Sequence, residues 1–133
     1  MIWIIGGTSE AKSLIRKLEG NQPYIVSVAT YSGAEVLPQG NFVIGRMDHQ
    51  QMLQFIADYS VDTVVDMSHP YATEVTHHAK IACKAAGIRY IRYTRKSHAA
   101  ENAVYVVSVE ACATYLKTIT GNVFFTTGMK NIK

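Results

Sequence analysis

Short apolar runs alternate with amphipathic stretches along the whole 133-residue chain. Runs short enough for strands fall at residues 1–6, 24–29, 41–44, 61–67, 88–93, 104–107 and 123–127. Stretches with apolar side chains at helical spacing lie between them, at residues 8–19, 48–59, 73–86 and after Ser108. This alternation predicts right-handed βαβ units and an α/β fold with a doubly wound parallel sheet.

The predicted helices carry start and stop signals. Asp48 is followed three residues later by Gln51, which is the pattern of a capping box. Ser108 is expected to cap the last helix, and Gly20 to end the first. The helical side chains expected to pack inward are Ala11, Leu14, Ile15, Leu18, Met52, Phe55, Ile56, Tyr59, Val75, Ala79, Ala82, Ala86, Val109, Cys112, Ala113 and Leu116.

Composition narrows the class of protein. Hydrophobic residues make up 48% of the chain and charged residues 17%, as in a soluble globular domain. No apolar run reaches the roughly 18–20 residues of a membrane span. Cys83 and Cys112 lack paired spacing, so we expect neither a disulfide framework nor a thiolate metal site, and a reducing cytoplasm is the natural compartment. The net charge of +3 favours acidic small molecules at least as much as nucleic acid.

The first strand runs into the sequence IIGGTSEA at residues 4–11. Against the dinucleotide-binding pattern G-x-G-x-x-G/A, Gly6 takes the first glycine position and Ala11 the small residue, while Thr8 replaces the middle glycine. Backbone N–H groups at the helix start, aided by the hydroxyls of Thr8 and Ser9, suit a phosphate group. The alternative is a plain strand-to-helix bend in which Glu10 complements the helix dipole.

The end of the second strand carries no carboxylate. NAD-binding domains place an acid there to hold the adenosine ribose, whereas this chain has Thr30, Tyr31 and Ser32. An end without an acid favours NADP(H), because an acid would repel the 2′-phosphate. Arg46 is the nearest cation, with a solvated surface charge as the alternative, and Asp48 is expected to cap a helix.

The sequence DMSHPYA at residues 66–72 follows the fourth strand. Because doubly wound sheets bind ligands at the carboxyl ends of their strands, we expect Ser68, His69 and Pro70 in the crevice. His69 could donate a proton near neutral pH, and a structural role is the alternative. His77 and His78 are neighbours on a helix and cannot face one metal ion, so we expect no metal site.

A basic run follows the fifth strand and contains Arg89, Arg92, Arg95, Lys96 and His98. Strand alternation puts Arg89 and Arg95 on one face and Arg92 on the other, so the run is not a single patch. Arg95 and Lys96 lie beyond the strand end and suit a polyanionic ligand. We expect the rest of the run to be solvated.

Three motifs together resemble a known family. The sequences GGTSEA at residues 6–11, DMSHPYA at 66–72 and TTGMK at 126–130 are similar to motifs of the precorrin-6A reductases of corrinoid biosynthesis, which include the cobalt-precorrin-6A reductases. The family patterns are G-G-T-x-E-A, D-[AM]-[ST]-H-P-[FY]-A and T-T-G-x-K, and the second discriminates best. The resemblance spans nearly all of the chain.

The resemblance implies an NADPH-dependent oxidoreductase that reduces one double bond of a tetrapyrrole-derived macrocycle by hydride transfer. It also implies two Rossmann-like domains that flank a ligand cleft. The residues expected at the cofactor site are Gly6, Gly7, Thr8, Ser9, Glu10, Thr30, Ser32, Arg46, Ser68 and Pro70. His69 is the first residue to test as a catalytic group. The residues expected to meet the substrate are Arg95 and Lys96, by their chemistry, and Thr126, Thr127 and Gly128, by their place in the last motif.

The chain departs from the family in two loops and in length. The family's arginine after the second strand is missing from residues 30–32, and its R-P-[AS]-W after the fifth strand reads RKSH at 95–98. The family's enzymes are longer, which agrees with a last strand that lacks a covering element; a disordered tail is the alternative. We expect a Rossmann-like NADP(H)-binding domain at residues 1–120 and the first strand and turn of a second domain at 121–133. The edge of that last strand could also pair two copies of the chain.

Three rival functions follow from the same residues. A non-catalytic NADP(H)-binding module would bind the cofactor without reductase activity. A short-chain dehydrogenase needs a Tyr-x-x-x-Lys pair, and no tyrosine in this chain has a lysine four residues later. A nucleic-acid role is disfavoured by the modest charge and by the lack of a concentrated basic face.

Overall fold

The computed structural model describes residues 1–35, 41–95, 100 and 102–126. The chain divides into two compact units, Met1–Arg95 and Lys96–Lys133. The strands of the first unit are β1 (Ile2–Ile5), β2 (Tyr24–Val28), β3 (Phe42–Ile44), β4 (Thr63–Asp66) and β5 (Arg89–Arg92). Its helices are α1 (Ser9–Leu18), α2 (Tyr31–Glu35), α3 (His49–Asp58) and α4 (Thr73–Ala86).

The five strands form one parallel sheet in the order β3-β2-β1-β4-β5. The chain moves outward from β1 to β3 and then returns to the other side of β1 for β4, so the strand order reverses between β1 and β4. Doubly wound sheets bind ligands at such a switch point, outside the carboxyl ends of the strands. The predicted α/β fold with a doubly wound parallel sheet is confirmed.

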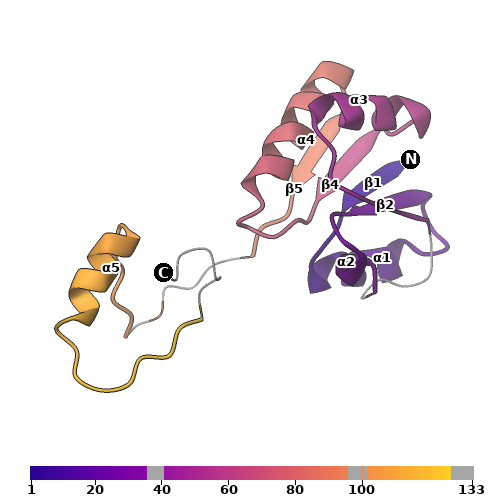
Figure 1. Cartoon of the computed structure of the whole chain (residues 1–133). Coiled ribbons are helices and arrows are strands. Elements are labelled where there is room, and N and C mark those ends of the chain that lie inside the picture. Colours follow the sequence, from indigo (N-terminus) through magenta and orange to yellow (C-terminus); the bar gives the residue numbers. More distant parts are fainter. Residues whose placement is uncertain (36–40, 96–99, 101, 127–133) are drawn as a thin grey trace. The chain divides into compact units, whose positions relative to one another are not determined.

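Apolar side chains on the two faces of the sheet form two separate cores. One core joins Trp3 of β1 to Phe55 of α3 and Ala82 of α4. The other joins Ile4 of β1 to Ile15 of α1 and to α2. Figure 1 shows the same division, with α3 and α4 over one face and α1 and α2 over the other. Because both faces are covered, the central strands read as apolar runs in the sequence.

Local capping signals set the limits of the long helices. Thr8 caps α1 by accepting a hydrogen bond from the Ala11 N–H, and Asp48 and Gln51 form the predicted capping box of α3. Gly87 ends α4 in the left-handed conformation with φ of 67°. These three helices therefore begin and end within one residue of their predicted limits. No helix in the described residues is both long enough and apolar enough to cross a membrane.

One inward-facing expectation in α3 is wrong. Met52, Phe55 and Ile56 are buried as predicted, but Tyr59 is 41% exposed. The helix ends at Asp58 and Tyr59 is its C-cap residue, so the side chain lies past the last turn. Its ring packs beside that of Phe55, with centroids 4.5 Å apart.

The second unit contains α5 (Val109–Leu116), and the predicted cap is present because Ser108 Oγ accepts a hydrogen bond from the Ala111 N–H. The strands predicted at residues 104–107 and 123–127 are wrong wherever the structure describes them, since residues 104–107 and 123–126 are not in strands. Residue 127 lies outside the described residues. A strand must pair its backbone groups with a neighbour, and these two runs pair with none in the described part of the unit.

The expected inner face of α5 is also wrong. No residue of the helix is buried: Val109 is 56% exposed, Ala113 is exposed, and Cys112 and Leu116 are half-buried. The amphipathic pattern is present in the sequence, but the described residues of the second unit contain no sheet to cover this face.

Candidate functional site

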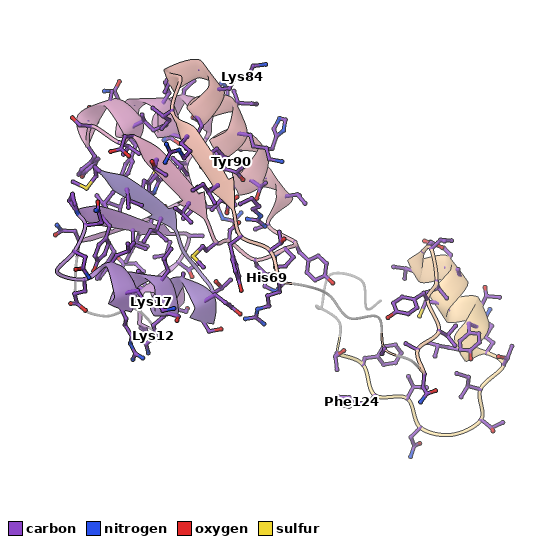
Figure 2. The ribbon with its side chains drawn as sticks, turned by 180° about the vertical axis from the view of Figure 1, so that it is seen from behind. Lys12, Lys17, His69, Lys84, Tyr90 and Phe124 are labelled. Carbon is purple, nitrogen blue, oxygen red and sulfur yellow. The ribbon has the colours of Figure 1, made fainter. Side chains whose placement is uncertain are left out.

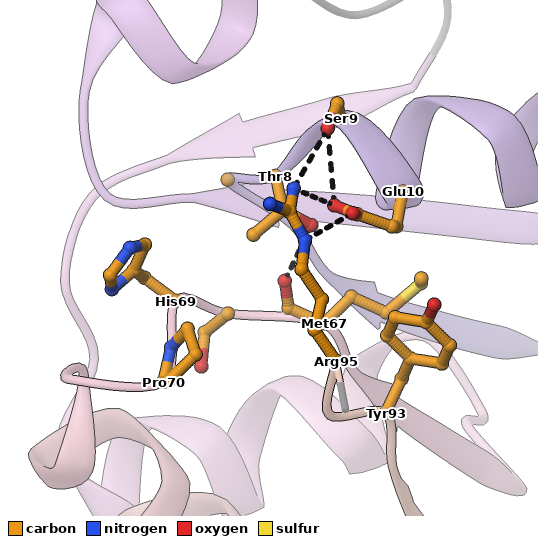
Figure 3. A pocket seen from close by; sticks show the side chains of 10 residues that line it. Thr8, Ser9, Glu10, Met67, His69, Pro70, Tyr93 and Arg95 are labelled. Carbon is orange, nitrogen blue, oxygen red and sulfur yellow. Dashed lines mark hydrogen bonds and ion pairs between the residues drawn. The ribbon is translucent and has the colours of Figure 1, made fainter. Parts of the chain in front are cut away.

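A pocket of about 330 Å³ opens at the carboxyl ends of β1 and β4, where the strand order reverses. Its lining consists of Gly7, Thr8, Ser9 and Glu10 after β1, Met67, Ser68, His69 and Pro70 after β4, and Tyr93 and Arg95 after β5. Figure 3 shows these three segments facing one another. The structure thus brings together the two motifs that the sequence places far apart.

Two glycines shape the turn after β1. Gly6 passes so close to β2 that a Cβ would lie 3.2 Å from Val26 Cγ1 and 3.3 Å from Val28 Cγ1. Gly7 has φ of +122°, which L side chains rarely adopt, and the position of its absent Cβ is open. The backbone therefore enters the pocket with no side chain between it and a ligand.

The Thr8 hydroxyl joins the two loops of the pocket. It accepts the Ala11 N–H at 3.4 Å and donates to the Met67 carbonyl oxygen at 2.9 Å. A hydroxyl has one proton to donate, and this one is used within the protein. In this geometry Thr8 holds the turn in place. The Ser9 hydroxyl donates to Glu10 Oε2 at 3.1 Å, so donors to an anion come from the backbone.

Glu10 and Arg95 form an ion pair on the pocket wall. Arg95 Nη2 donates to Glu10 Oε2 at 2.7 Å and to Ser9 Oγ at 3.1 Å, as the dashed lines in Figure 3 show. The hydrogen bond from Arg95 lowers the pKa of Glu10 to about 2, so the carboxylate is charged at neutral pH. Arg95 lines the pocket, and its charge is balanced by Glu10.

The loop after β4 contains a tight turn at residues 69–72. The Ala72 N–H donates to the His69 carbonyl oxygen at 2.8 Å, and Pro70 stands at the second position of the turn, which its ring favours. His69 Nδ1 accepts the Tyr71 N–H at 3.3 Å. A neutral His69 therefore carries its proton on Nε2. His69 lies on the exposed loop at the end of β4 (Figure 2).

A fully buried carboxylate, Asp66, lies behind this loop. Its Oδ2 accepts the Thr76 and Tyr90 hydroxyls, both at 2.8 Å. Its Oδ1 accepts the Ser68 N–H at 3.0 Å and the Arg92 guanidinium at 2.5 Å. Burial alone would raise the pKa of Asp66, but hydrogen bonds from Ser68, Tyr90 and Thr76 outweigh it and lower the pKa. Asp66 is therefore ionised.

Arg92 contradicts the expectation that it is solvated, since its side chain is 17% exposed and pairs with Asp66. One signal in the sequence could have found this pair. Asp66 is the carboxylate that ends an apolar run, and a carboxylate in a covered strand needs a cation close by. The next parallel strand offers two arginines, and the register places Arg92 beside Asp66. Arg89, by contrast, is exposed as expected.

The residues expected to hold the far end of a dinucleotide do not line the pocket. Thr30 and Ser32 are exposed after β2, and Thr30 Oγ1 accepts the Gly33 N–H at 3.3 Å. Arg46 is exposed after β3. All three follow the carboxyl ends of neighbouring parallel strands, at the same edge of the sheet as the pocket.

Of the other expected substrate residues, the structure describes only Thr126. Thr126 is exposed in the second unit, and Lys96, Thr127 and Gly128 lie outside the described residues. The described residues contain no group of three or more potential metal-ligating side chains of His, Cys, Asp or Glu.

This strand order, with a glycine turn at the start of α1 and a pocket at the switch point, defines a Rossmann-like domain. The family model described as "Precorrin-6x reductase CbiJ/CobK" matches residues 1–133. The chain therefore belongs to the precorrin-6x reductase family, and the resemblance found in its motifs is confirmed.

Three curated relatives illustrate what this chain is similar to. The cobalt-precorrin-6A reductase of Methanococcus maripaludis is 32% identical over 138 residues, which cover 99% of this chain and 56% of the relative. That of Salmonella typhimurium is 37% identical over 97 residues, covering 71% of this chain and 37% of the relative. The precorrin-6A reductase of Mycobacterium tuberculosis is 29% identical over 133 residues, covering 98% and 54%. The chain spans about half the length of the curated relatives it matches.

A comparison with solved structures also supports the Rossmann-like fold. The protein titled "CobK precorrin-6A reductase" matches with a TM-score of 0.70 and 25% sequence identity. The match covers 76% of this chain and 41% of that structure.

Proposed function

We propose that this chain is the cofactor-binding part of a precorrin-6A reductase and that the cofactor is NADPH. The observation that carries the proposal is the pocket at the switch point, where the glycine turn of α1 faces the loop of Ser68, His69 and Pro70. The proposed reaction of the whole enzyme is the reduction of one double bond of the precorrin-6A or cobalt-precorrin-6A macrocycle to the 6B product, in cobalamin biosynthesis.

The pocket residues fit the phosphates of a dinucleotide. The first N–H groups of a helix have no partner within the helix and attract anions. The open space at Gly7 gives a phosphate access to the backbone. Ser9 would add a donor once its hydroxyl proton turned from Glu10 Oε2 to the phosphate. Glu10 is the unfavourable group, and its pairing with Arg95 offsets its charge. When bound, NADPH supplies a hydride from its nicotinamide ring.

The choice of NADPH over NADH rests on the end of β2. Thr30 and Ser32 are exposed there and carry no negative charge, and Arg46 is exposed at the end of the neighbouring strand β3. This surface suits a 2′-phosphate, whereas NAD sites place a carboxylate at the same point.

The opposite wall of the pocket suits the reacting end of the cofactor. His69 holds its proton on Nε2 when neutral, because Nδ1 accepts the Tyr71 N–H. We propose that the protonated form of His69, its imidazolium, donates a proton and leaves the neutral ring. Arg95, through guanidinium N–H groups that its pairing with Glu10 leaves over, and Lys96 would bind the acidic macrocycle through charge-assisted hydrogen bonds. Residues 126–128 would face the same substrate from a second domain.

The domain division and the compartment are part of the proposal. We propose a Rossmann-like domain at residues 1–120, a second domain from residue 121, and a cytoplasmic enzyme that acts without nucleic acid or membrane. Pairing of two copies through residues 123–127 is not proposed, because residues 123–126 are not in a strand.

Titration of the chain with NADPH, NADP⁺ and NADH tests the proposal. We expect nicotinamide fluorescence to report tighter binding of NADPH than of NADH. Failure to bind any of the three would refute the cofactor site, and a preference for NADH would refute the argument from β2. The alternative, a non-catalytic NADP(H)-binding module, predicts that a full-length form binds NADPH but does not reduce the macrocycle.

A further inference from the structure

Arg92 lies at the end of β5, opposite the last residue of β4. The parallel register pairs it with Asp66, and Nη1 donates to Asp66 Oδ1 at 2.5 Å. The carboxylate is fully buried, and a buried charge without a partner is strongly destabilising. Contact with Asp66 would be enough to meet that need, yet the guanidinium makes further contacts.

The guanidinium continues past Asp66 to the loop that lines the pocket. Nη1 donates to Ser68 Oγ at 2.7 Å, and Nη2 donates to the His69 carbonyl oxygen at 3.4 Å. On the same side, Asp66 Oδ1 accepts the Ser68 N–H at 3.0 Å. One ion pair therefore holds a hydroxyl, an amide and a carbonyl of the loop from behind.

The front of the loop forms a wall of the pocket. Figure 3 shows His69 and Pro70 beside the turn that carries Thr8. Thr8 fixes the start of the same loop through its hydrogen bond to the Met67 carbonyl oxygen. Held on both sides, the loop has a geometry that the protein fixes without a ligand. Preorganisation of this kind strengthens binding because less freedom is lost in the complex.

We propose that Arg92 is a positioning residue for the cofactor: its guanidinium fixes Ser68 and His69 in the geometry that accepts NADPH. This inference rests on the proposed function. Arg92 itself does not line the pocket. An arginine suits this role because Nη1 reaches Asp66 and Ser68 while Nη2, in the same rigid plane, reaches the His69 carbonyl oxygen. The ammonium of a lysine is a single point at the end of a flexible stem.

The test compares two Arg→Lys substitutions on one strand. Arg92→Lys keeps the charge beside Asp66 and removes the fork, and Arg89→Lys changes an exposed residue outside the network. NADPH is titrated into each folded chain. We expect Arg92→Lys to raise the dissociation constant about tenfold, equal to about 1.4 kcal/mol, and Arg89→Lys to leave it unchanged.

Hydrogen exchange without cofactor supplies a second measurement. The Ser68 amide should exchange about tenfold faster in Arg92→Lys, because the loop opens more often, while the amide of Ile4 in β1 keeps its rate. Wild-type affinity and wild-type exchange in Arg92→Lys would overturn the inference, even if the melting temperature fell. If the wild-type chain does not bind NADPH, the proposed function fails instead. Exchange of the Ser68 amide then decides the loop-ordering claim, which faster exchange supports and an unchanged rate overturns.

Discussion

Replacement of Asp66 by asparagine tests whether the buried ion pair stabilises the sheet. Asparagine keeps the shape of the side chain and removes its charge. The Thr76 and Tyr90 hydroxyls, which donate to Oδ2, can rotate to accept from the new NH₂ group. The substitution therefore leaves the hydrogen-bond network largely intact and isolates the loss of the charge opposite Arg92.

The size of the effect follows from the burial of the pair. Removal of one partner of a buried ion pair costs about 3–5 kcal/mol. The Arg92 side chain is 17% exposed, so water compensates part of the loss, and we expect about 3 kcal/mol from the lower end of that range. With a urea m value of about 1.5 kcal/mol per molar, this loss lowers the unfolding midpoint by about 2 M.

Urea unfolding followed by Trp3 fluorescence measures the midpoint. Trp3 is the single tryptophan of the chain and is 1% exposed in β1, so its emission reports unfolding of the sheet. The matched control is Asp62→Asn. Asp62 precedes the same strand, is 69% exposed and pairs with the N-terminal amine, and an exposed pair contributes little. We expect the control to leave the midpoint nearly unchanged.

Acidification adds an independent check on the same carboxylate. The folded-state pKa of Asp66 lies below its ordinary value of 3.8. Its stabilising effect is therefore present above that value and is lost as the pH falls through the lower folded pKa. Wild-type stability should decrease below about pH 4 more steeply than that of Asp66→Asn. A midpoint within about 0.3 M of wild type, with the same acid dependence, would refute the charged pair.

Three further substitutions test the pocket. Gly7→Ala should destabilise the chain by about 1–3 kcal/mol, because φ of +122° is strained for an L side chain, and it should also weaken NADPH binding. The control is Gly20→Ala, which is strained at φ of +77° outside the pocket. It should lower stability and leave NADPH binding at the wild-type level. Glu10→Gln should tighten NADPH binding severalfold in calorimetric titrations at low salt, because it removes a negative charge beside the proposed phosphate site. Glu19→Gln, at the other end of α1, is the control. Weaker binding of NADPH by Glu10→Gln would mean that Glu10 is needed to orient Arg95. His69→Ala in a full-length enzyme should lower kcat about a hundredfold if the His69 imidazolium donates the proton. The exposed His77→Ala is the control, and unchanged turnover would refute the role of His69 as proton donor.

The sheet of the first unit was predictable because its signals are local. The apolar runs of β1 and β4 are long enough to mark covered strands, and the Asp48–Gln51 capping box marks the start of α3 without any tertiary contact. The position of the pocket followed from the carboxyl ends of β1 and β4, since a parallel sheet brings these ends to one edge. The local sequence pattern, together with the rule that parallel sheets bind ligands at the carboxyl ends of their strands, was sufficient to predict the sheet and the place of the pocket.

The predictions failed where the outcome depends on a neighbour. The run at residues 104–107 is rich in valine, but β-propensity describes how well side chains fit a sheet that is already present, and no strand pairs with it in the described residues. The solvated state predicted for Arg92 failed for the opposite reason, because strand alternation gives the face of a side chain and not the buried group across from it. The hydrogen bond from Thr8 to Met67 likewise depends on how closely two loops approach each other.

The pairing of Asp66 with Arg92 also selects the register of the edge strand. β5 has weak hydrophobic alternation, with Arg89 and Ile91 exposed and Tyr90 and Arg92 half-buried. A slip of one residue would place Ile91 or Tyr93 beside Asp66, and the buried carboxylate would then face no cation. Such a state is disfavoured by several kcal/mol. The ion pair therefore specifies the register of β5, because it makes the misaligned pairings less stable than the native one. Apolar contacts alone would not distinguish these registers.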